Sequence, residues 1–374
     1  MSEPIRVLQV IGKMDRGGAE SMIMNLYREI DKEKVQFDFL VHTTAEGKFD
    51  AEIKKMGGKI HRVQRCKLNN VISYYKECDA FFKSHPEYKI VHGHIGSCAS
   101  YYLLAAKRNG CYTIAHSHSA AATKSFKDFL FNVSAFPTRY IADQLFGCST
   151  EAGQARYGKR SVKWKKYMNF ANGIDLDKFY YNTESRIKIR NEFNVKEDEL
   201  VVGTIGRLTP PKNPHMLYDV FKKLVTLYPN VKCLWIGTGE LEDEIKSWIL
   251  SDNLQAKIIM TGVRSDVHEL VQGMDCFLFP SLWEGLPVTV IEAQAADLPC
   301  VLSDTISKEV AVTDLIEWHS LKESSEMWAK RCMELAKQSK NVSRVSPKEE
   351  IRRSGYDIHE TSRWLSEFYI KHNK

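Results

Sequence analysis

The strongest constraint on the fold is an alternation of short β-rich runs with helical patterns, which begins at residue 5 and restarts halfway along the chain. Residues 5–11 read as a buried strand, a loop with two glycines follows, and residues 19–30 place Met22, Leu26 and Ile30 on one helical face. Such alternation is typical of a parallel sheet covered by helices on both faces. Further strands of this first sheet are expected at residues 35–41, 59–63, 90–93, 112–116 and 145–149.

The pattern restarts after residues 169–179, which read NFANGIDLDKF and join a strand end to turn residues. Two domains agree with the length, since 374 residues exceed the size at which one core usually keeps growing. The predicted fold class is α/β, with two Rossmann-like doubly wound parallel-sheet domains that face a cleft. In the second domain, strands are expected at residues 200–205, 231–236, 257–260, 276–280 and 300–303, and helices at 214–227 and 241–250.

We place the first domain at residues 1–175 and the second at residues 176–353. Residues 354–374 are predicted to form a C-terminal helix that packs back on the first domain, because Trp364 and Leu365 lie on an amphipathic stretch. Open parallel sheets bind ligands beyond the carboxyl ends of their strands. The functional site is therefore expected in the loops that follow the strands of both domains.

Composition indicates a packed protein of a reducing compartment. The chain is 43% hydrophobic and 27% charged, which is ordinary for a globular protein. Its nine cysteines are odd in number and include no Cys-x-x-Cys pair, which favours reduced thiols, a cytoplasmic location and no structural zinc. No run of eighteen apolar residues is present, so no transmembrane helix is expected.

The net charge of +6 is unevenly distributed. Residues 1–180 contain 28 Lys and Arg against 18 Asp and Glu, a balance of +10, which leaves −4 for residues 181–374. A basic half is suited to anionic lipid or a phosphorylated acceptor, whereas the alternative is an ordinary solvated surface. Nucleic acid is not an expected partner.

Residues 281–292, SLWEGLPVTVIE, follow a predicted strand and open a helix. Gly285 and Leu286 would present free backbone N–H groups at the helix start, which can bind a phosphate or a sugar hydroxyl, with Pro287 completing the turn. Glu284 would lie at the rim, and Glu292, two turns further, can reach a ribose hydroxyl. The alternative is that the carboxylates only complement the helix dipole.

Residues 206–213, GRLTPPKN, also lie between a strand and a helix. Arg207 and Lys212 can neutralise a diphosphate, the first as a planar fork and the second as a point charge. A single contact at about 4 Å is worth roughly 4 kcal/mol before desolvation at an effective dielectric near 20. The alternatives are a surface ion pair for Arg207 and a solvated loop charge for Lys212.

Two glycine pairs are weaker signals. Gly17 and Gly18 let backbone approach a ligand at a helix start, but the residue after Gly17 is not the Lys of a P-loop. Gly237 and Gly239 resemble half of a dinucleotide fingerprint whose third glycine position is occupied by Glu242, which disfavours NAD.

Four histidines, His92 and His94 in VHGHIG and His116 and His118 in AHSHS, lie at expected strand ends. Each pair shares one face of an extended segment. A zinc site is conceivable, but no cysteine or carboxylate accompanies the histidines at ligand spacing, which favours hydrogen-bonding roles.

Asp175 and Asp177 form an Asp-x-Asp arrangement that could hold a divalent metal. Their place after Asn172 and Gly173, away from strand ends, favours turn formation instead. No bound metal is predicted.

In order and spacing, GGAE, AHSHS, NGID, GRLTPPKN and EGLPVTVIE resemble family four of the retaining glycosyltransferases, which have the GT-B architecture. The resemblance extends over nearly the whole chain, and EGLP with a Glu at the eighth position is its most specific part. It implies a retaining, metal-independent enzyme of the hexosyltransferase type, without a cofactor. The donor would be a nucleotide diphosphate sugar, by family habit a UDP-sugar, bound by the second domain, and the first domain would bind the acceptor.

The resemblance also implies roles for individual residues. Arg207 and Lys212 would hold the donor diphosphate, Glu284 the hydroxyls of the transferred sugar, and Glu292 the ribose. His116 would contact the transferred sugar near the reacting carbon. The other donor-binding positions would be Gly285, Leu286 and Pro287 beside sugar or phosphate, Val263 beside the nucleobase, and Gly17 and Gly18 beside the phosphate or the acceptor.

The surrounding text, including VLSDTISKE, most resembles enzymes of bacterial capsule and exopolysaccharide assembly. Their acceptors are typically undecaprenyl diphosphate-linked saccharides at the inner membrane face. Residues 124–146 mix aromatic and basic side chains, among them Lys124, Phe126, Phe129, Phe136 and Arg139, and could lie on an anionic membrane, although a buried helix pair is an equal alternative. The cluster of Lys159, Arg160, Lys163, Lys165 and Lys166 would add attraction for anionic lipid.

Two other functions remain open at this point. A nucleotide-sugar epimerase or hydrolase on the same fold would turn over the donor without an acceptor. A non-catalytic nucleotide-sugar-binding protein would keep the fold alone, and the intact set of Arg207, Lys212, Glu284 and Glu292 argues against it.

Overall fold

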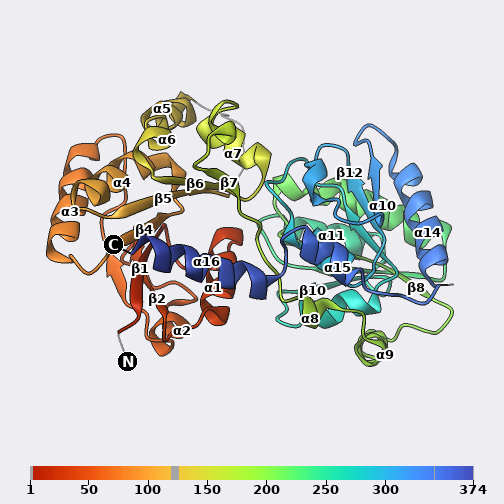
Figure 1. The fold of residues 1–374 in the computed structure, drawn as a ribbon. Coiled ribbons are helices and arrows are strands. Elements are labelled where there is room, and N and C mark those ends of the chain that lie inside the picture. The colour runs from red at the N-terminus through yellow and green to blue at the C-terminus, as the bar shows by residue number, and fades with distance from the viewer. Residues whose placement is uncertain (1–2, 119–125, 341, 374) are drawn as a thin grey trace. The chain divides into compact units, whose positions relative to one another are not determined.

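The computed structural model describes residues 3–118, 126–340 and 342–373. The chain divides into two compact units, one formed by Met1–Gly173 with Asp357–Lys374 and the other by Ile174–Tyr356 (Figure 1). The divisions lie within three residues of the boundaries that we place at 175 and 353 from the sequence.

The first unit contains a parallel sheet of seven strands in the order β3-β2-β1-β4-β5-β6-β7. The order reverses between β1 and β4, which is the switch point at which open parallel sheets bind ligands. The strands are β1 Ile5–Ile11, β2 Val35–Val41, β3 Ile60–Arg62, β4 Ile90–Gly93, β5 Tyr112–Ser117, β6 Gln144–Gly147 and β7 Tyr167–Asn169.

Helices cover both faces of this sheet. The α-helices of the first unit are α1 Gly18–Glu29, α2 Asp50–Lys55, α3 Val71–Ser84, α4 Ala99–Arg108, α5 Phe126–Ala135, α6 Thr138–Ile141, α7 Thr150–Tyr157 and α16 Ile358–His372. One core packs α1 and α16 against the face that carries Val7 and Phe37, and the other packs α3 and α4 against the face that carries Leu8 and Val10. Successive strand residues enter opposite cores, as a period of two requires.

The last helix, α16, joins the first unit although it follows the whole second unit in sequence (Figure 1). It contacts α1, β1 and β2, and it buries Ile358, Leu365 and Tyr369 in their shared core. Burial of an apolar side chain of this size stabilises a fold by roughly 1.5–3 kcal/mol. The predicted return of the C-terminal helix to the first domain agrees with this packing.

The second unit contains a parallel sheet of six strands in the order β10-β9-β8-β11-β12-β13. Its order reverses between β8 and β11. The strands are β8 Leu200–Ile205, β9 Val231–Ile236, β10 Ile258–Gly262, β11 Cys276–Phe279, β12 Cys300–Ser303 and β13 Ile316–His319. The α-helices are α8 Leu176–Phe179, α9 Thr183–Glu192, α10 Pro214–Leu227, α11 Glu242–Ser251, α12 Val267–Leu270, α13 Val288–Ala295, α14 Ser325–Lys340 and α15 Lys348–Arg353.

Two strands, β7 and β13, were absent from the prediction. Both lie at the edge of their sheet, and β13 reads IEWH with every residue only partly buried. In β7, Tyr167–Asn169, no residue is buried either. Neither strand contains an apolar run like the one that Ile258, Ile259 and Met260 give to the edge strand β10, which was predicted.

Candidate active site

Residues from four neighbouring strands meet at one edge of the second sheet. Strands β10, β9, β8 and β11 are adjacent and parallel, so the loops after their carboxyl ends lie at the same edge. These loops carry Val263, Gly237, Arg207 with Lys212, and Glu284, in that order of strands. The edge is therefore where the second unit is expected to bind a ligand.

Lys212 and Glu284, which are distant in sequence, form an ion pair at this edge. The Lys212 Nζ lies 2.6 Å from the Glu284 Oε1, and the two side chains are only 23% and 13% exposed. The same ammonium lies 4.7 Å from the centre of the Phe279 ring, a cation–π distance. Lys212 is thus held in a fixed, largely buried place and is not a solvated loop charge.

The backbone around Lys212 is fixed by Asn213. Lys212 ends the short 3₁₀-helix η3, Pro210–Lys212, and Asn213 adopts a left-handed conformation with φ 55° and ψ 55° before α10 begins at Pro214. The Asn213 side-chain amide donates to the Pro280 carbonyl at 3.1 Å, and the Leu282 N–H donates to the Pro211 carbonyl at 2.8 Å. These bonds tie the loop after β8 to the loop after β11.

Asn213 was not singled out from the sequence. Asparagine tolerates the left-handed region better than most residues, and a proline at the first helical position marks a helix start. An asparagine directly before Pro214 was therefore the available signal.

Arg207 does not join the ion pair. It follows Gly206 at the end of β8, its side chain is exposed, and it forms no ion pair or side-chain hydrogen bond with the residues that the structure describes. The surface ion pair considered as an alternative for Arg207 is thus not formed within that part of the chain. Its guanidinium is available to a ligand at the same sheet edge as Lys212.

Helix α13 carries the rest of the predicted donor-binding segment. Pro287 is its N-terminal cap residue and Leu286 is buried with 8% exposure, while Gly285 and Glu284 precede them. Burial raises the pKa of Glu292, on the second turn of α13, to about 7. No charge or hydrogen bond from the described residues offsets this desolvation, so Glu292 is poised to be stabilised by a hydrogen-bond donor from outside the chain.

Gly237 and Gly239 serve close packing between two loops. A Cβ on Gly237 would lie 2.0 Å from the Gly206 carbonyl oxygen, and one on Gly239 would lie 2.3 Å from the Leu208 carbonyl oxygen. The Gly237 N–H also donates to the Gly262 carbonyl at 2.9 Å. The two glycines thus let the loop after β9 lie against the loop that carries Arg207, a structural reason for the partial fingerprint.

Val263 follows the end of β10 and is 58% exposed. An exposed apolar side chain at this edge is suited to contact with the flat face of a nucleobase.

The first unit places its predicted residues at the carboxyl ends of β1, β4 and β5. Gly17 is the N-terminal cap residue of α1, and a Cβ on it would lie 2.2 Å from the Glu20 carboxylate, whereas a Cβ on Gly18 would have no described atom within 4 Å. His116, at the end of β5, is buried with 2% exposure. Its ring stacks on His92 and lies 4.1 Å, centre to centre, from His118.

Three of the histidines, His92, His94 and His116, have ring nitrogens within 4.8 Å of one another, close enough to hold a metal ion. The imidazole nitrogens of His92 and His94 are, however, all in contact with protein partners, namely Tyr369, His116, Gln9 and His118. These contacts are those expected of the hydrogen-bonding role, and the absence of a bound metal stays a prediction.

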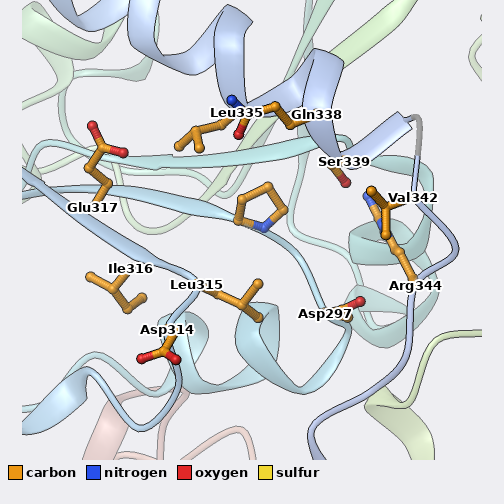
Figure 2. A pocket seen from close by; sticks show the side chains of 11 residues that line it. Asp297, Asp314, Leu315, Ile316, Glu317, Leu335, Gln338, Ser339, Val342 and Arg344 are labelled. Carbon is orange, nitrogen blue, oxygen red and sulfur yellow. The ribbon is translucent and has the colours of Figure 1, made fainter.

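A cavity of about 300 Å³ lies elsewhere in the second unit (Figure 2). It is lined by residues that precede β12 and β13, among them Asp297, Asp314 and Leu315, and by α14. Because all strands of this sheet are parallel, these residues lie at the amino ends, opposite the edge that carries Lys212 and Glu284. No predicted donor-binding residue lines the cavity.

Comparison with solved structures defines the fold. The structure of HepE from Anabaena in complex with UDP and glucose superposes with a TM-score of 0.78, at 15% sequence identity, over 97% of this chain and 99% of that one. Together with two Rossmann-like parallel-sheet units, this similarity shows the GT-B fold of glycosyltransferases.

Sequence comparison then gives the family. The family model described as "Glycosyl transferases group 1" matches residues 185–352. "Putative glycosyltransferase EpsF" of Bacillus subtilis (strain 168) is 32% identical over 358 residues, which cover 94% of this chain and 93% of that protein. The chain belongs to the family of glycosyl transferases group 1.

A second relative has a more detailed description. The "UDP-Gal:alpha-D-GlcNAc-diphosphoundecaprenol alpha-1,3-galactosyltransferase" of Escherichia coli is 27% identical over 244 residues, which cover 63% of this chain and 62% of that protein. The resemblance predicted from the motifs is thus confirmed, and the enzyme class is glycosyltransferase.

Proposed function

We propose that this enzyme transfers a hexose from a UDP-sugar to a hydroxyl of a lipid-linked saccharide, with retention of anomeric configuration and without a metal, in capsule or exopolysaccharide synthesis. The observation that carries the proposal is the Lys212–Glu284 pair, which sets a cation and a carboxylate side by side at the ligand-binding edge of the second sheet. Support for UDP and for an undecaprenyl diphosphate-linked acceptor comes from the descriptions of HepE and of the Escherichia coli transferase.

The Lys212–Glu284 pair suits a nucleotide sugar, which presents both an anionic diphosphate and sugar hydroxyls. A diphosphate needs positive charge as it departs, and Lys212, with Arg207 exposed beside it, supplies that charge. Sugar hydroxyls need a hydrogen-bond acceptor. Glu284 supplies it when Lys212 pairs with the phosphate of the nucleotide sugar instead of with Glu284. Because Lys212 and Arg207 would neutralise the charge of the departing diphosphate, a task that a metal ion could otherwise perform, we propose that the enzyme is metal-independent.

The remaining donor contacts follow from the same sheet edge. The backbone at Gly285 and Leu286, before α13, would bind sugar or phosphate, and Pro287, which has no N–H, would complete the turn beside them. Val263 would contact the uracil, and Glu292 would accept hydrogen bonds from the ribose. For retention, the departing phosphate would take the proton of the acceptor hydroxyl on the same face of the sugar, so no carboxylate nucleophile is needed.

A thermal-shift panel of nucleotides and nucleotide sugars tests the donor. A ligand at a hundred times its dissociation constant stabilises the folded protein by roughly 2.7 kcal/mol, so the correct donor is expected to raise the midpoint by several degrees. Donor consumption measured with and without a lipid-linked acceptor separates transfer from epimerisation or hydrolysis. Turnover that is independent of acceptor would contradict the proposal.

Glu292 gives the donor complex a defined pH dependence. Its pKa of about 7 in the free enzyme should fall when ribose hydroxyls donate to the carboxylate, because they stabilise its ionised form. Affinity for UDP-glucose is therefore expected to tighten as pH rises from 6 to 8, by at most about tenfold, because a carboxyl with a pKa of about 7 is roughly one-tenth ionised at pH 6 and almost fully ionised at pH 8. UDP-glucose is preferred to UDP as the probe because its diphosphate has no terminal group that titrates in this range.

Isothermal titration at pH 6, 7 and 8 measures this dependence, and Glu292→Gln is the matched variant, since an amide of the same size cannot ionise. The variant is expected to bind UDP-glucose with nearly constant affinity over the range. An equally steep pH profile in Glu292→Gln would assign the titration to another group.

An exposed aromatic strip supports membrane contact by the first unit. Phe129 and Val133 of α5, Phe136, and Tyr140 of α6 are each about half exposed or more, and Tyr140 lies 5.6 Å, ring centre to ring centre, from Trp164. Trp164 lies in the segment that contains the predicted basic cluster. In this cluster Lys159, Arg160, Lys163 and Lys165 are exposed, whereas Lys166 donates to the Ala142 carbonyl. We name Phe129, Val133, Phe136, Tyr140 and these four exposed basic residues the lipid face.

The buried helix pair considered as an alternative for residues 124–146 is wrong for these four side chains, since they are exposed. Lys124 of the predicted segment lies outside the described residues, as do the side chains of Phe126 and Phe131. Within the described ranges, no helix is both long enough and apolar enough to cross a membrane.

The double variant Phe136→Ser/Tyr140→Ser is expected to lower binding to phosphatidylglycerol vesicles at least tenfold, because it removes two aromatic anchors. Lys163→Ala/Lys165→Ala should weaken the same binding by roughly 1 kcal/mol per residue and leave binding to phosphatidylcholine unchanged. Co-sedimentation measures both effects. The control is Ile187→Ser/Leu250→Ser, two exposed apolar residues of the second unit. Equal losses in the control would remove the assignment of the lipid face.

A further inference from the structure

A polar network interrupts the core of the first unit beneath α16. Gln9, His92 and His116 lie on the same sheet face as Val7, Ile90 and Ile114, and each is at most 2% exposed. Polar side chains buried this deeply need hydrogen-bond partners. Those partners fix the proton positions of the cluster.

Two branches of hydrogen bonds start at the two ends of the Gln9 amide. In the first, the Gln9 Nε2 donates to the Tyr369 hydroxyl at 3.4 Å, this hydroxyl lies 2.6 Å from the His92 Nδ1, and the His92 Nε2 lies 3.2 Å from the His116 Nδ1. In the second, the Gln9 Oε1 lies 2.9 Å from the His94 Nε2, and the His94 Nδ1 lies 2.8 Å from the His118 Nε2.

All four rings are neutral near pH 7. Burial lowers the pKa of His92 to about 3 and that of His118 to about 4, and it lowers the pKa values of His94 and His116 well below the usual range. A neutral imidazole has one N–H and one bare nitrogen. The direction of each hydrogen bond in a branch therefore fixes the direction of the next one.

In the first branch, the Tyr369 oxygen accepts from Gln9, and the His92 Nδ1 is the acceptor that the described residues offer to the Tyr369 proton. The His92 Nε2–H then donates to the His116 Nδ1, which leaves the proton of His116 on Nε2. In the second branch, the Gln9 Oε1 accepts from the His94 Nε2–H, so the bare His94 Nδ1 accepts from the His118 Nε2–H, and the His118 Nδ1 is bare.

The two branches thus end on neighbouring rings with opposite character. The His116 Nε2 is a donor and the His118 Nδ1 is an acceptor, and both atoms are buried without a hydrogen-bond partner in the described parts of the chain. The ring centres lie 4.1 Å apart. If the Gln9 amide oxygen and nitrogen exchanged places, the direction of every hydrogen bond in both branches would reverse. One of the two terminal nitrogens would still be a donor and the other an acceptor.

We propose that Gln9 and Tyr369 are positioning residues that hold His116 and His118 in complementary states, one donor and one acceptor, so that together they recognise a sugar hydroxyl, which both donates and accepts. Only the identity of the ligand rests on the proposed function. The arrangement of protons is a property of the free protein, so it can be tested without turnover.

Long-range ¹H–¹⁵N NMR spectra report the tautomer of each histidine. The two branches require that His92, His94, His116 and His118 share one tautomer in the free protein, and the orientation of Gln9 predicts the proton on Nε2 in all four. Protons on Nδ1 in all four rings would also support the proposal, with His116 as the acceptor and His118 as the donor. A tautomer in any one ring that differs from the other three would overturn it.

Tyr369→Phe uncouples only the first branch. His92 and His116 are then expected to become mixtures of tautomers, whereas His94 and His118 keep theirs. The matched control is Tyr27→Phe, which also removes a buried tyrosine hydroxyl bound to a glutamine amide, that of Gln36. Tautomers that stay pure in folded Tyr369→Phe, or that change equally in the control, would overturn the role of Tyr369. Should Tyr369→Phe fail to fold, the wild-type spectrum still decides.

Titration with UDP-glucose, UDP-galactose and UDP-N-acetylglucosamine tests the ligand. At least one is expected to shift the His116 Nε2 and His118 Nδ1 resonances without a change of tautomer. Shared tautomers that none of the three probes perturbs would overturn the recognition of a hydroxyl. Failure of the proposed function would appear separately, as absence of sugar transfer in the donor-consumption assay.

Discussion

Replacing Lys212 by alanine is expected to lower kcat/KM for sugar transfer by about two to three orders of magnitude, while the fold stays intact. The variant removes the cation that is held 2.6 Å from Glu284 and that would neutralise the departing diphosphate. Loss of one preorganised group that stabilises developing negative charge typically has this cost. Glu284→Ala should also impair transfer strongly, through loss of the acceptor for sugar hydroxyls.

Initial rates of donor-dependent product formation measure these effects. Lys246→Ala is the matched control, because Lys246 also pairs with a glutamate, Glu242, at 2.6 Å in the same unit, but its side chain is 51% exposed on α11. Its rate should be unchanged, and circular dichroism should show all three variants folded. Near-normal transfer by both Lys212→Ala and Glu284→Ala would remove the pair from the active site.

Gly237→Ala is expected to destabilise the second unit by about 3 kcal/mol or more. Gly237 has φ 135°, a conformation that side chains rarely adopt, and its Cβ would meet the Gly206 carbonyl oxygen at 2.0 Å. Both the strained backbone and the overlap must be relieved by moving the loop before Arg207. For a unit of this size the thermal midpoint should fall by about 6–12 °C.

Differential scanning calorimetry measures this shift, and Gly262→Ala separates its two causes. Gly262 also has a positive φ, 70°, but its Cβ position has no described atom within 4 Å. Its variant should lose only about 1–2 kcal/mol through strain. Equal midpoints for the two variants would mean that the loop after β9 does not pack on the loop after β8 as tightly as described.

The sequence was sufficient for the elements that bury apolar side chains on a regular period. Strands β2 and β8 and helix α10 have the predicted bounds, because each is a continuous run of buried residues or a clear amphipathic face. Strands β7 and β13 were missed, since neither contains such a run. The GT-B fold was predicted from motif order and is confirmed by the comparison with HepE.

At the candidate site, the sequence identified residues but not their contacts. It named Lys212 and Glu284 separately, and only the pairing of β8 with β11 brings them together. It treated Gly237 and Gly239 as a failed cofactor motif, because a close approach of two loops is a tertiary feature without a local pattern. The partners of the histidines were equally hidden, since Tyr369 is far from His92 in sequence.

The packing of α16 also has a consequence for synthesis on the ribosome. Domains usually fold as units while the chain emerges, the N-terminal one first. Here the N-terminal unit lacks Leu365 and Tyr369 of its core until every residue of the other unit has been translated. During translation, one apolar face of the first sheet therefore stays partly exposed to solvent until α16 has been made. The second unit can complete its fold before the first unit does.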